Sequence, residues 1–268
     1  MLTIRLCLQT FIFKFKEMLI SFQHKNTSYQ ADLSQPIDIS IPLKINALDN
    51  PNAWYCPMPE AEPQRFGKLK IAVDEGAVIN SYGVRLFPHG NGTHTEGVGH
   101  LTKSKDWRVN SINQVLKEFH CLTHLISIYP TRTDNGDRII FKNQIEEIFK
   151  NNDAKALIIR TLPNDDLKLT MNWSGTNPPY IDGAAMAYIV ESGVQHLLID
   201  LPSVDREDDG GKVVAHRVFW KGNRAENCTI TEMIYVPNDA QDGLYLLNLQ
   251  IPSFEMDAAP SKPVLYKI

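Results

Sequence analysis

The sequence predicts a single mixed α/β domain that contains more strand than helix. Short apolar runs such as ALIIRT (156–161) and HLLIDLP (196–202) are typical of buried strands, and the stretch between them includes a helical pattern at 182–192. The C-terminal third carries further strand-like runs. No repeat, low-complexity tract or long linker divides the chain, so we expect one domain.

The first part of the chain is predicted to hold an extension and several strands. Residues 1–28 form the extension and residues 29–268 the domain. Residues 29–45 alternate apolar and polar positions and are interrupted by Pro36 and Pro42, which favours an edge strand with turns. We then expect, in order, an irregular surface loop at 46–67, strands at 71–75 and 82–87 separated by a turn near Gly76, a short helix at 112–119 and a buried strand at 121–130.

The second part alternates predicted helices with strands. Ile145, Ile148 and Phe149 fall on one side of a helix at 143–151. The helix at 182–192 is the clearest in the chain, and Gly193 is a suitable residue to end it. Strands are predicted at 156–161, 196–202, 213–220, 228–236, 244–252 and 263–268.

Composition limits the classes of function. The chain has 268 residues, 43% hydrophobic and 22% charged, which is ordinary for a globular protein with a large core. A net charge of -4 without a Lys/Arg cluster argues against nucleic-acid binding. The four cysteines lie far apart without a CxxC pair, which indicates neither a structural zinc site nor a disulfide framework. We therefore expect a cytoplasmic protein.

The first twenty residues superficially resemble a signal peptide, because basic residues flank the apolar stretch LCLQTFIF. That stretch is short, contains Gln9, and is not followed by a clear cleavage site. It is also too short to span a bilayer, so no membrane association is expected. The alternatives are an N-terminal helix or strand, or an upstream extension with the natural start at Met18.

The segment 89–100 (HGNGTHTEGVGH) concentrates the residues that suggest chemistry. Three of the eight histidines lie here, together with Glu96. In an extended chain alternate side chains share a face, so His94, Glu96 and His100 would point into one pocket. Two imidazoles and a carboxylate at this spacing suit Zn, Mn or Fe. From spacing alone, a solvated His/Gly/Thr turn is an equally good interpretation.

Several motifs give the chain a resemblance to a known family. GTHTEGVGH (92–100) resembles the HxGTHxDxPxH signature of the cyclase family, which includes bacterial kynurenine formamidase and isatin hydrolase. Further matches follow in family order from about residue 30 to the C-terminus: DLSQP (32–36), GVQHLLIDLPSVD (193–205), AH (215–216) with ITE (230–232), and DAAPSKPVL (257–265).

The resemblance implies a fold and a site. The fold is a swivelling β/β/α sandwich, assembled as a homo-oligomer, either a dimer or a tetramer. One or two divalent metal ions per chain, Zn or Mn, are implied. His100 would act as the general acid/base. The metal ligands would be His89, His94, Glu96, His216 and Glu232.

Three positions depart from the family pattern. The family's first metal histidine corresponds to Gly90, so His89 lies one residue too far from His94. A bulge at 90–92 could return His89 to the metal; in the alternative, His89 points to solvent and the remaining ligands suffice. Glu96 stands in place of aspartate, and Val98 in place of proline.

The function implied is hydrolysis of an amide C–N bond in a small molecule, with an aryl formamide such as N-formylkynurenine as the leading substrate. A metal-activated water would attack the carbonyl, and His100 would exchange the proton. A cyclic amide or imide such as isatin is the alternative substrate. A catalytically silent paralogue that binds a small metabolite is the alternative outside enzymes.

Overall fold

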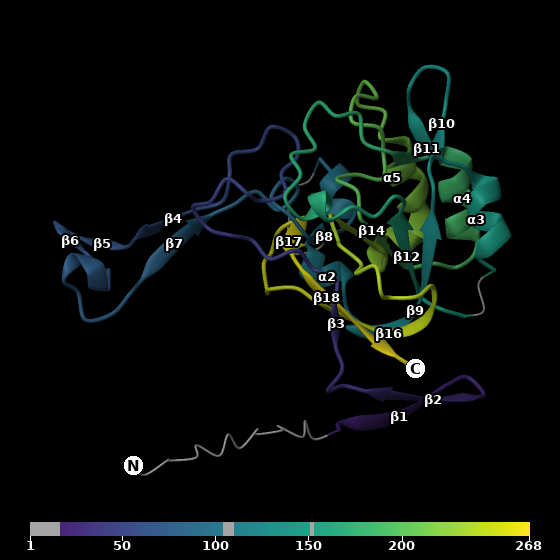
Figure 1. The fold of residues 1–268 in the computed structure, drawn as a ribbon, viewed down its shortest axis with the longest axis horizontal. Coiled ribbons are helices and arrows are strands. Elements are labelled where there is room, and N and C mark those ends of the chain that lie inside the picture. The colour runs from purple at the N-terminus through teal and green to yellow at the C-terminus, as the bar shows by residue number, and fades with distance from the viewer. Residues whose placement is uncertain (1–16, 104–109, 151–152) are drawn as a thin grey trace, which may run out of the picture.

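A nine-stranded mixed sheet forms the centre of the computed structural model, which describes residues 17–103, 110–150 and 153–268 (Figure 1). The strands β15, β14, β12 and β9 run parallel to one another, and every other neighbouring pair in the sheet is antiparallel. The order is β17 (Ala258–Pro260), β8 (His94–Glu96), β15 (Thr229–Glu232), β14 (His196–Ile199), β12 (Ala156–Thr161), β9 (His120–Ile128), β16 (Gly243–Gln250), β18 (Lys262–Lys267) and β3 (Ile37–Asp38).

Both faces of the parallel strands are buried, because side chains of β12 alternate between two hydrophobic cores. Leu157 and Ile159 lie in the core that also contains residues of three helices. These helices are α3 (Lys142–Ile148), α4 (Gly183–Glu191) and α5 (Val214–Phe219). Ile158 faces the opposite core, which the curled end of the sheet and the short helix α2 (Ile112–Val115) enclose.

Smaller sheets surround this body. The hairpin of β1 (Leu19–His24) and β2 (Thr27–Asp32) lies below it, and the boundary predicted after residue 28 falls within β2 (Figure 1). β4 (Glu60–Pro63) pairs with β7 (Tyr82–Arg85) and β5 (Arg65–Phe66) with β6 (Leu69–Lys70), forming an arm that projects from the body (Figure 1). A third sheet contains β10 (Thr131–Arg132), β11 (Arg138–Ile140) and β13 (Tyr180–Ile181).

The predicted fold class, a mixed α/β single domain richer in strand than in helix, is confirmed. The strand predictions at 121–130, 156–161, 196–202, 228–236, 244–252 and 263–268 are confirmed as β9, β12, β14, β15, β16 and β18. The helix predictions correspond to α2, α3 and α4, although residue 151, the predicted end of α3, lies outside the described residues. No helix in the described part of the chain combines the length and apolar character needed to cross a bilayer.

The prediction of a strand at 213–220 is wrong, because these residues form α5. Its N-cap residue, Val213, has a left-handed backbone and no capping side chain. Instead the carboxylate of Asp205 accepts hydrogen bonds from the Ala215 and His216 amides at 2.7 and 3.1 Å. A carboxylate at a helix N-terminus stabilises the first turn, and here it comes from the loop that precedes the helix, ten residues before Ala215.

Two predictions in the region of the arm also need correction. The strand predicted at 71–75 is mostly a 3-10 turn, Val73–Glu75, which ends at Gly76 with φ of 91°. The irregular loop predicted at 46–67 contains β4 and β5 at its C-terminal end. β4 and β5 pair only within the arm, so burial does not impose on them the apolar alternation from which strands were predicted.

Candidate metal centre

β8 places two of the predicted ligands on one face of the sheet. His94 pairs with Glu232 of β15, and Glu96 pairs with Ala258 of β17, so β8 is held on both sides. His94 and Glu96 are both fully buried, with exposures of 0%. Nδ1 of His94 lies 2.9 Å from the Gly92 carbonyl oxygen, and since a carbonyl only accepts, Nδ1 carries the hydrogen. Nε2 of His94 therefore presents its lone pair to the cluster.

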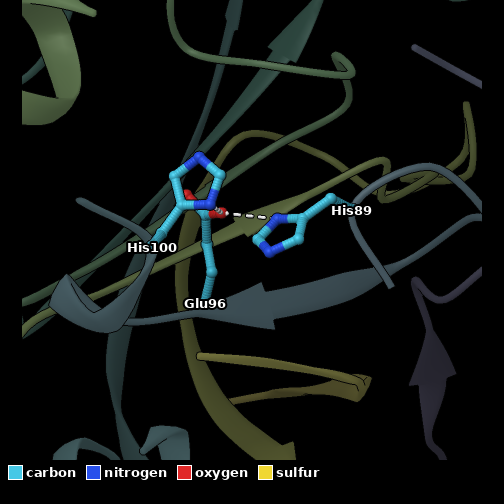
Figure 2. Close-up of side chains that lie close together, drawn as sticks. All are labelled: His89, Glu96 and His100. Atoms are coloured by element: carbon cyan, nitrogen blue, oxygen red, sulfur yellow. Dashed lines mark ion pairs between the residues drawn. The ribbon is translucent and has the colours of Figure 1, made fainter. Parts of the chain in front are cut away.

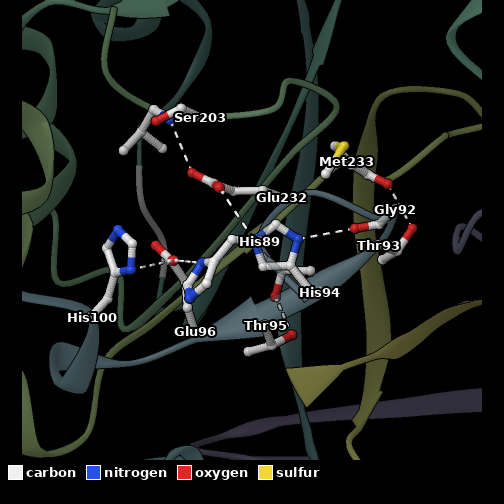
Figure 3. A network of polar contacts seen from close by, with 12 residues as sticks. His89, Gly92, Thr93, His94, Thr95, Glu96, His100, Ser203, Glu232 and Met233 are labelled. Atoms are coloured by element: carbon white, nitrogen blue, oxygen red, sulfur yellow. Dashed lines mark hydrogen bonds and ion pairs between the residues drawn. The ribbon is translucent and has the colours of Figure 1, made fainter. Parts of the chain in front are cut away.

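Two distant segments supply the partners of β8. The Nε2 atom of His216, on α5, lies 2.9 Å from Oε1 of Glu96. Nδ1 of the same ring lies 2.6 Å from Oδ2 of Asp205, which fixes the ring orientation. Glu232, at the end of β15, has Oε2 3.4 Å from Nε2 of His94, and its Oε1 accepts the Val204 amide at 3.0 Å (Figure 3). The sequence separation of these residues shows that folding creates the cluster.

The extra residue before the GTH core is accommodated in a tight turn. The amides of Gly90 and Asn91 both donate to the Phe87 carbonyl oxygen, and of the three residues at 90–92 only Gly92 has a positive φ, 98°. A Cβ atom on Gly90 would lie 2.4 Å from Sγ of Cys56, so only glycine fits. With this turn Nδ1 of His89 lies 3.0 Å from Oε2 of Glu96, and the ring does not point to solvent (Figure 2).

His100 reaches the cluster from the 3-10 turn Val98–Leu101 rather than from a continuation of β8. Its Nδ1 lies 3.8 Å from Oε2 of Glu96, and its ring centroid 4.3 Å from that of His89 (Figure 2). The side chain is 31% exposed, unlike those of His94 and Glu96. In the same turn Val98, which replaces the family's proline, packs against the helix-side core.

The carboxylates in the cluster raise the pKa of the imidazoles beside them. Burial alone would lower the pKa of His89, but hydrogen bonds to Asp257 and Glu96 raise it to about 10. The pKa of His216 also rises to about 10, because its bonds to Asp205 and Glu96 outweigh desolvation. Burial would raise the pKa of Glu96, yet the three neighbouring imidazoles hold it well below its usual range.

The donor atoms fit a divalent cation. Two groups have donor atoms within 4.8 Å of one another, His94 with Glu96 and Glu232, and His89 with Glu96 and His100. Nε2 of His94 is buried without a hydrogen bond, which is costly unless another ligand satisfies it. The raised pKa values of His89 and His216 favour protonation beside the buried carboxylates, and a divalent ion would serve the same electrostatic purpose while releasing protons.

The structure thus brings all six predicted site residues together, and it adds two carboxylates. Asp205, which the sequence linked to the site only through the PSVD match, bonds His216. Asp257 was not predicted as a site residue; its Oδ2 lies 2.9 Å from Nε2 of His89. Its position at the start of the DAAP motif was the one available signal.

A cavity of about 730 Å³ lies over the cluster, and its wall includes His89, Glu96, His100 and Glu232. The apolar part of the wall comes largely from the irregular loop and the residues before His89: Trp54, Leu86, Phe87, Pro88 and Met256. Trp54 has a left-handed backbone, with φ of 59°. A bulky residue in that conformation is uncommon and indicates that its surroundings hold it in place.

The mixed sheet thus carries a His/carboxylate cluster on β8, the neighbour of the edge strand β17. A family model described as "Putative cyclase" matches residues 31–206, about two thirds of the chain, so the chain belongs to the cyclase family and the resemblance is confirmed. His216 and Glu232 lie beyond the matched residues, and their membership of the cluster rests on the geometry given above.

Solved structures share this fold across 87% of the chain. A "predicted metal-dependent hydrolase from Bacillus stearothermophilus" aligns over 98% of its length with 15% identity and a TM-score of 0.60. An isatin hydrolase bound to the product analogue thioisatinate aligns over 92% of its length, with 14% identity and a TM-score of 0.62. Isatin hydrolase A from Labrenzia aggregata aligns over 93%, with 12% identity and a TM-score of 0.61. No curated protein gives a significant match.

Proposed function

We propose that the chain is a metal-dependent hydrolase of an amide C–N bond, with an aryl formamide such as N-formylkynurenine as the leading substrate. The observation that carries this proposal is the buried group of His94, Glu96 and Glu232, whose donor atoms converge and include one buried atom without a hydrogen bond, Nε2 of His94. A purely structural cluster would be expected to satisfy that nitrogen within the protein.

The residues that would hold the metal are His94, Glu96, His216 and Glu232, with His89 as a fifth. Zn or Mn suits this mixture of imidazole and carboxylate donors, and Glu96, which is shared by both groups, would allow one ion or two. When bound, the ion lowers the pKa of water and polarises a carbonyl oxygen. Neutral imidazoles are needed for ligation, and the Gly92 carbonyl and Asp205 already orient His94 and His216 for it.

His100 is suited to proton transfer because it borders the cavity and is partly exposed. Its Nδ1 faces the carboxylates of Glu96 and Asp257 at 3.8 and 3.7 Å, which leaves Nε2 for exchange with the substrate. The ring would accept a proton from the attacking water and donate one to the departing amine nitrogen. General acid/base help of this kind contributes about 10²–10⁴ in rate.

A cyclic amide or imide is the second candidate substrate, and the structural similarity to isatin hydrolases favours it. The cavity suits either substrate, because its apolar wall can accommodate an aromatic ring next to the metal ligands. The two reactions differ in stoichiometry. Formamide hydrolysis gives formate and an arylamine, whereas opening of a ring gives one product. A homo-oligomer is also proposed, on the basis of the family resemblance.

Elemental analysis and a substrate panel test the proposal. The purified protein should contain Zn or Mn near one or two ions per chain, and chelation should abolish turnover. A panel of formanilides and cyclic imides, assayed for formate and for ring opening, separates the two substrates. Full metal content without turnover of any member would favour the catalytically silent paralogue that binds a small metabolite.

A metal-bound crystal structure tests the fifth ligand. We expect a nitrogen of His89 about 2.0–2.2 Å from the ion, the distance of a ligating imidazole. The tight turn at 87–92 supports this expectation, since it already holds the ring against Glu96. A ring outside that distance, with the metal present, would limit the ligands to the other four.

A further inference from the structure

Asp257 has its main chain fixed next to the cluster. It immediately precedes β17, where Ala258 pairs with Glu96, and its carbonyl oxygen accepts the Gly97 amide at 3.0 Å. A Cβ atom on Gly99 would lie 3.1 Å from Cβ and 3.2 Å from Cα of Asp257, so the glycine permits this close approach. The carboxylate is therefore anchored beside both segments that carry the site.

The Asp257 side chain contacts two histidines of the site. Oδ2 lies 2.9 Å from Nε2 of His89, a hydrogen bond, and 3.7 Å from Nδ1 of His100, an electrostatic contact. A carboxylate accepts, so Nε2 of His89 carries the hydrogen of its bond to Asp257, while Nδ1 of His100 faces the same oxygen. The opposite nitrogen of His89, Nδ1, faces Glu96 at 3.0 Å, and Nε2 of His100 faces away from Asp257.

We propose that Asp257 is a positioning residue that orients His89 and His100 together. It directs Nδ1 of His89 toward Glu96 and leaves Nε2 of His100 for proton exchange in the cavity. This inference rests on the proposed function. Carboxylates that hold metal-ligating histidines in one tautomer have this effect in metal sites generally.

One carboxylate can contact both histidines because their rings lie close together. The rings of His89 and His100 lie with centroids only 4.3 Å apart, and both present a nitrogen to the same side chain. Glu255, two residues earlier, accepts a hydrogen bond from Ser111 instead and lies 3.4 Å from Nδ2 of Asn113. A substitution at Glu255 therefore changes how the same segment is held but removes no contact with His89 or His100, which makes it a suitable control.

The experiment compares Asp257→Asn with the matched control Glu255→Gln. Co²⁺ serves as the probe, and its affinity and absorption spectrum are measured by titration of the metal-free proteins. We expect Asp257→Asn to lose about 10- to 100-fold in Co²⁺ affinity with an altered spectrum, and to lower kcat with little change in KM. Glu255→Gln should resemble wild type in each readout. If both variants bind Co²⁺ equally and give the same spectrum, the inference is wrong.

A second measurement separates this inference from the proposed function. If wild type binds Co²⁺ but cleaves no amide, the proposed function fails, and the comparison of affinities still tests Asp257. A crystal structure of metal-free Asp257→Asn needs neither metal nor activity. We expect the rings of His89 and His100 to leave their wild-type orientations, and unchanged rings would overturn the inference.

Discussion

The site has two halves that differ in burial and in how they are held. The inner half, His94, Glu96, His216 and Glu232, is 0–3% exposed and comes from two strands and a helix. The outer half has side chains 20–31% exposed and comes from a turn, a 3-10 helix and the segment before an edge strand: His89, His100 and Asp257. Rigid elements position side chains more accurately than loops do, so we assign ligation mainly to the inner half and proton transfer to the outer half.

The largest expected effect comes from the inner half. His94→Ala should remove the metal and all measurable turnover, because it deletes one of the proposed ligands. It also leaves the buried carboxylates of Glu96 and Glu232 without the imidazole that completes their group. Metal content by elemental analysis, with turnover on the same sample, tests this expectation. His120→Ala is the matched control, since His120 lies on β9 and contacts Asn248 outside the site. Full metal content in His94→Ala would contradict the assignment of ligands to the inner half.

A smaller effect is expected in the outer half. His100→Ala should lower kcat by about 10²–10⁴ while metal content stays near that of wild type, since the side chain is assigned to proton transfer. Elemental analysis and steady-state kinetics on one preparation separate the two properties. Loss of the metal in this variant would instead make His100 a ligand and remove the functional difference between the halves.

The two halves also differ in how far the sequence predicted them. Strand parity placed His94 and Glu96 on one face, and β8 confirms this because a period of two is a local property of the backbone. The same parity argument does not explain His100, which the 3-10 turn after Gly97 brings to the cluster. That His216 lies near Glu96 was predicted only through the family resemblance, because 120 residues separate the two in sequence.

Contacts between distant segments explain what the sequence did not predict. The apolar run at 213–220 was predicted as a strand, but Asp205, ten residues before Ala215, caps its first turn and it forms the helix α5. Asp257 was overlooked because its contact with His89 spans 168 residues and depends on the pairing of β17 with β8. Neither a local period nor local spacing contains such information.

The apolar wall of the cavity supplies the smallest predicted effect. Trp54 borders the cavity and is not one of the proposed metal ligands, so its contribution should concern substrate binding. Aromatic pairs contribute about 0.5–1.5 kcal/mol, which corresponds to an increase of about 2- to 12-fold in KM for Trp54→Ala on an aryl substrate. Because this contact with the substrate ring is the same in the substrate complex and in the transition state, kcat should change little.

The thermal stability of Trp54→Ala should show whether the higher KM reflects a lost substrate contact or a disturbed local structure. Trp54 and Tyr55 have positive φ values of 59° and 53°, and the turn is held by bonds from Ala53 to Gly90 and from Tyr55 to Ser174. Alanine in the same conformation keeps the backbone strain and these bonds, so the thermal midpoint should change little. Trp54→Phe keeps an aromatic ring and should preserve most of the affinity. If both variants lower kcat and leave KM unchanged, Trp54 acts on the inner half through the turn at Gly90, and the cavity wall is not where the substrate ring binds.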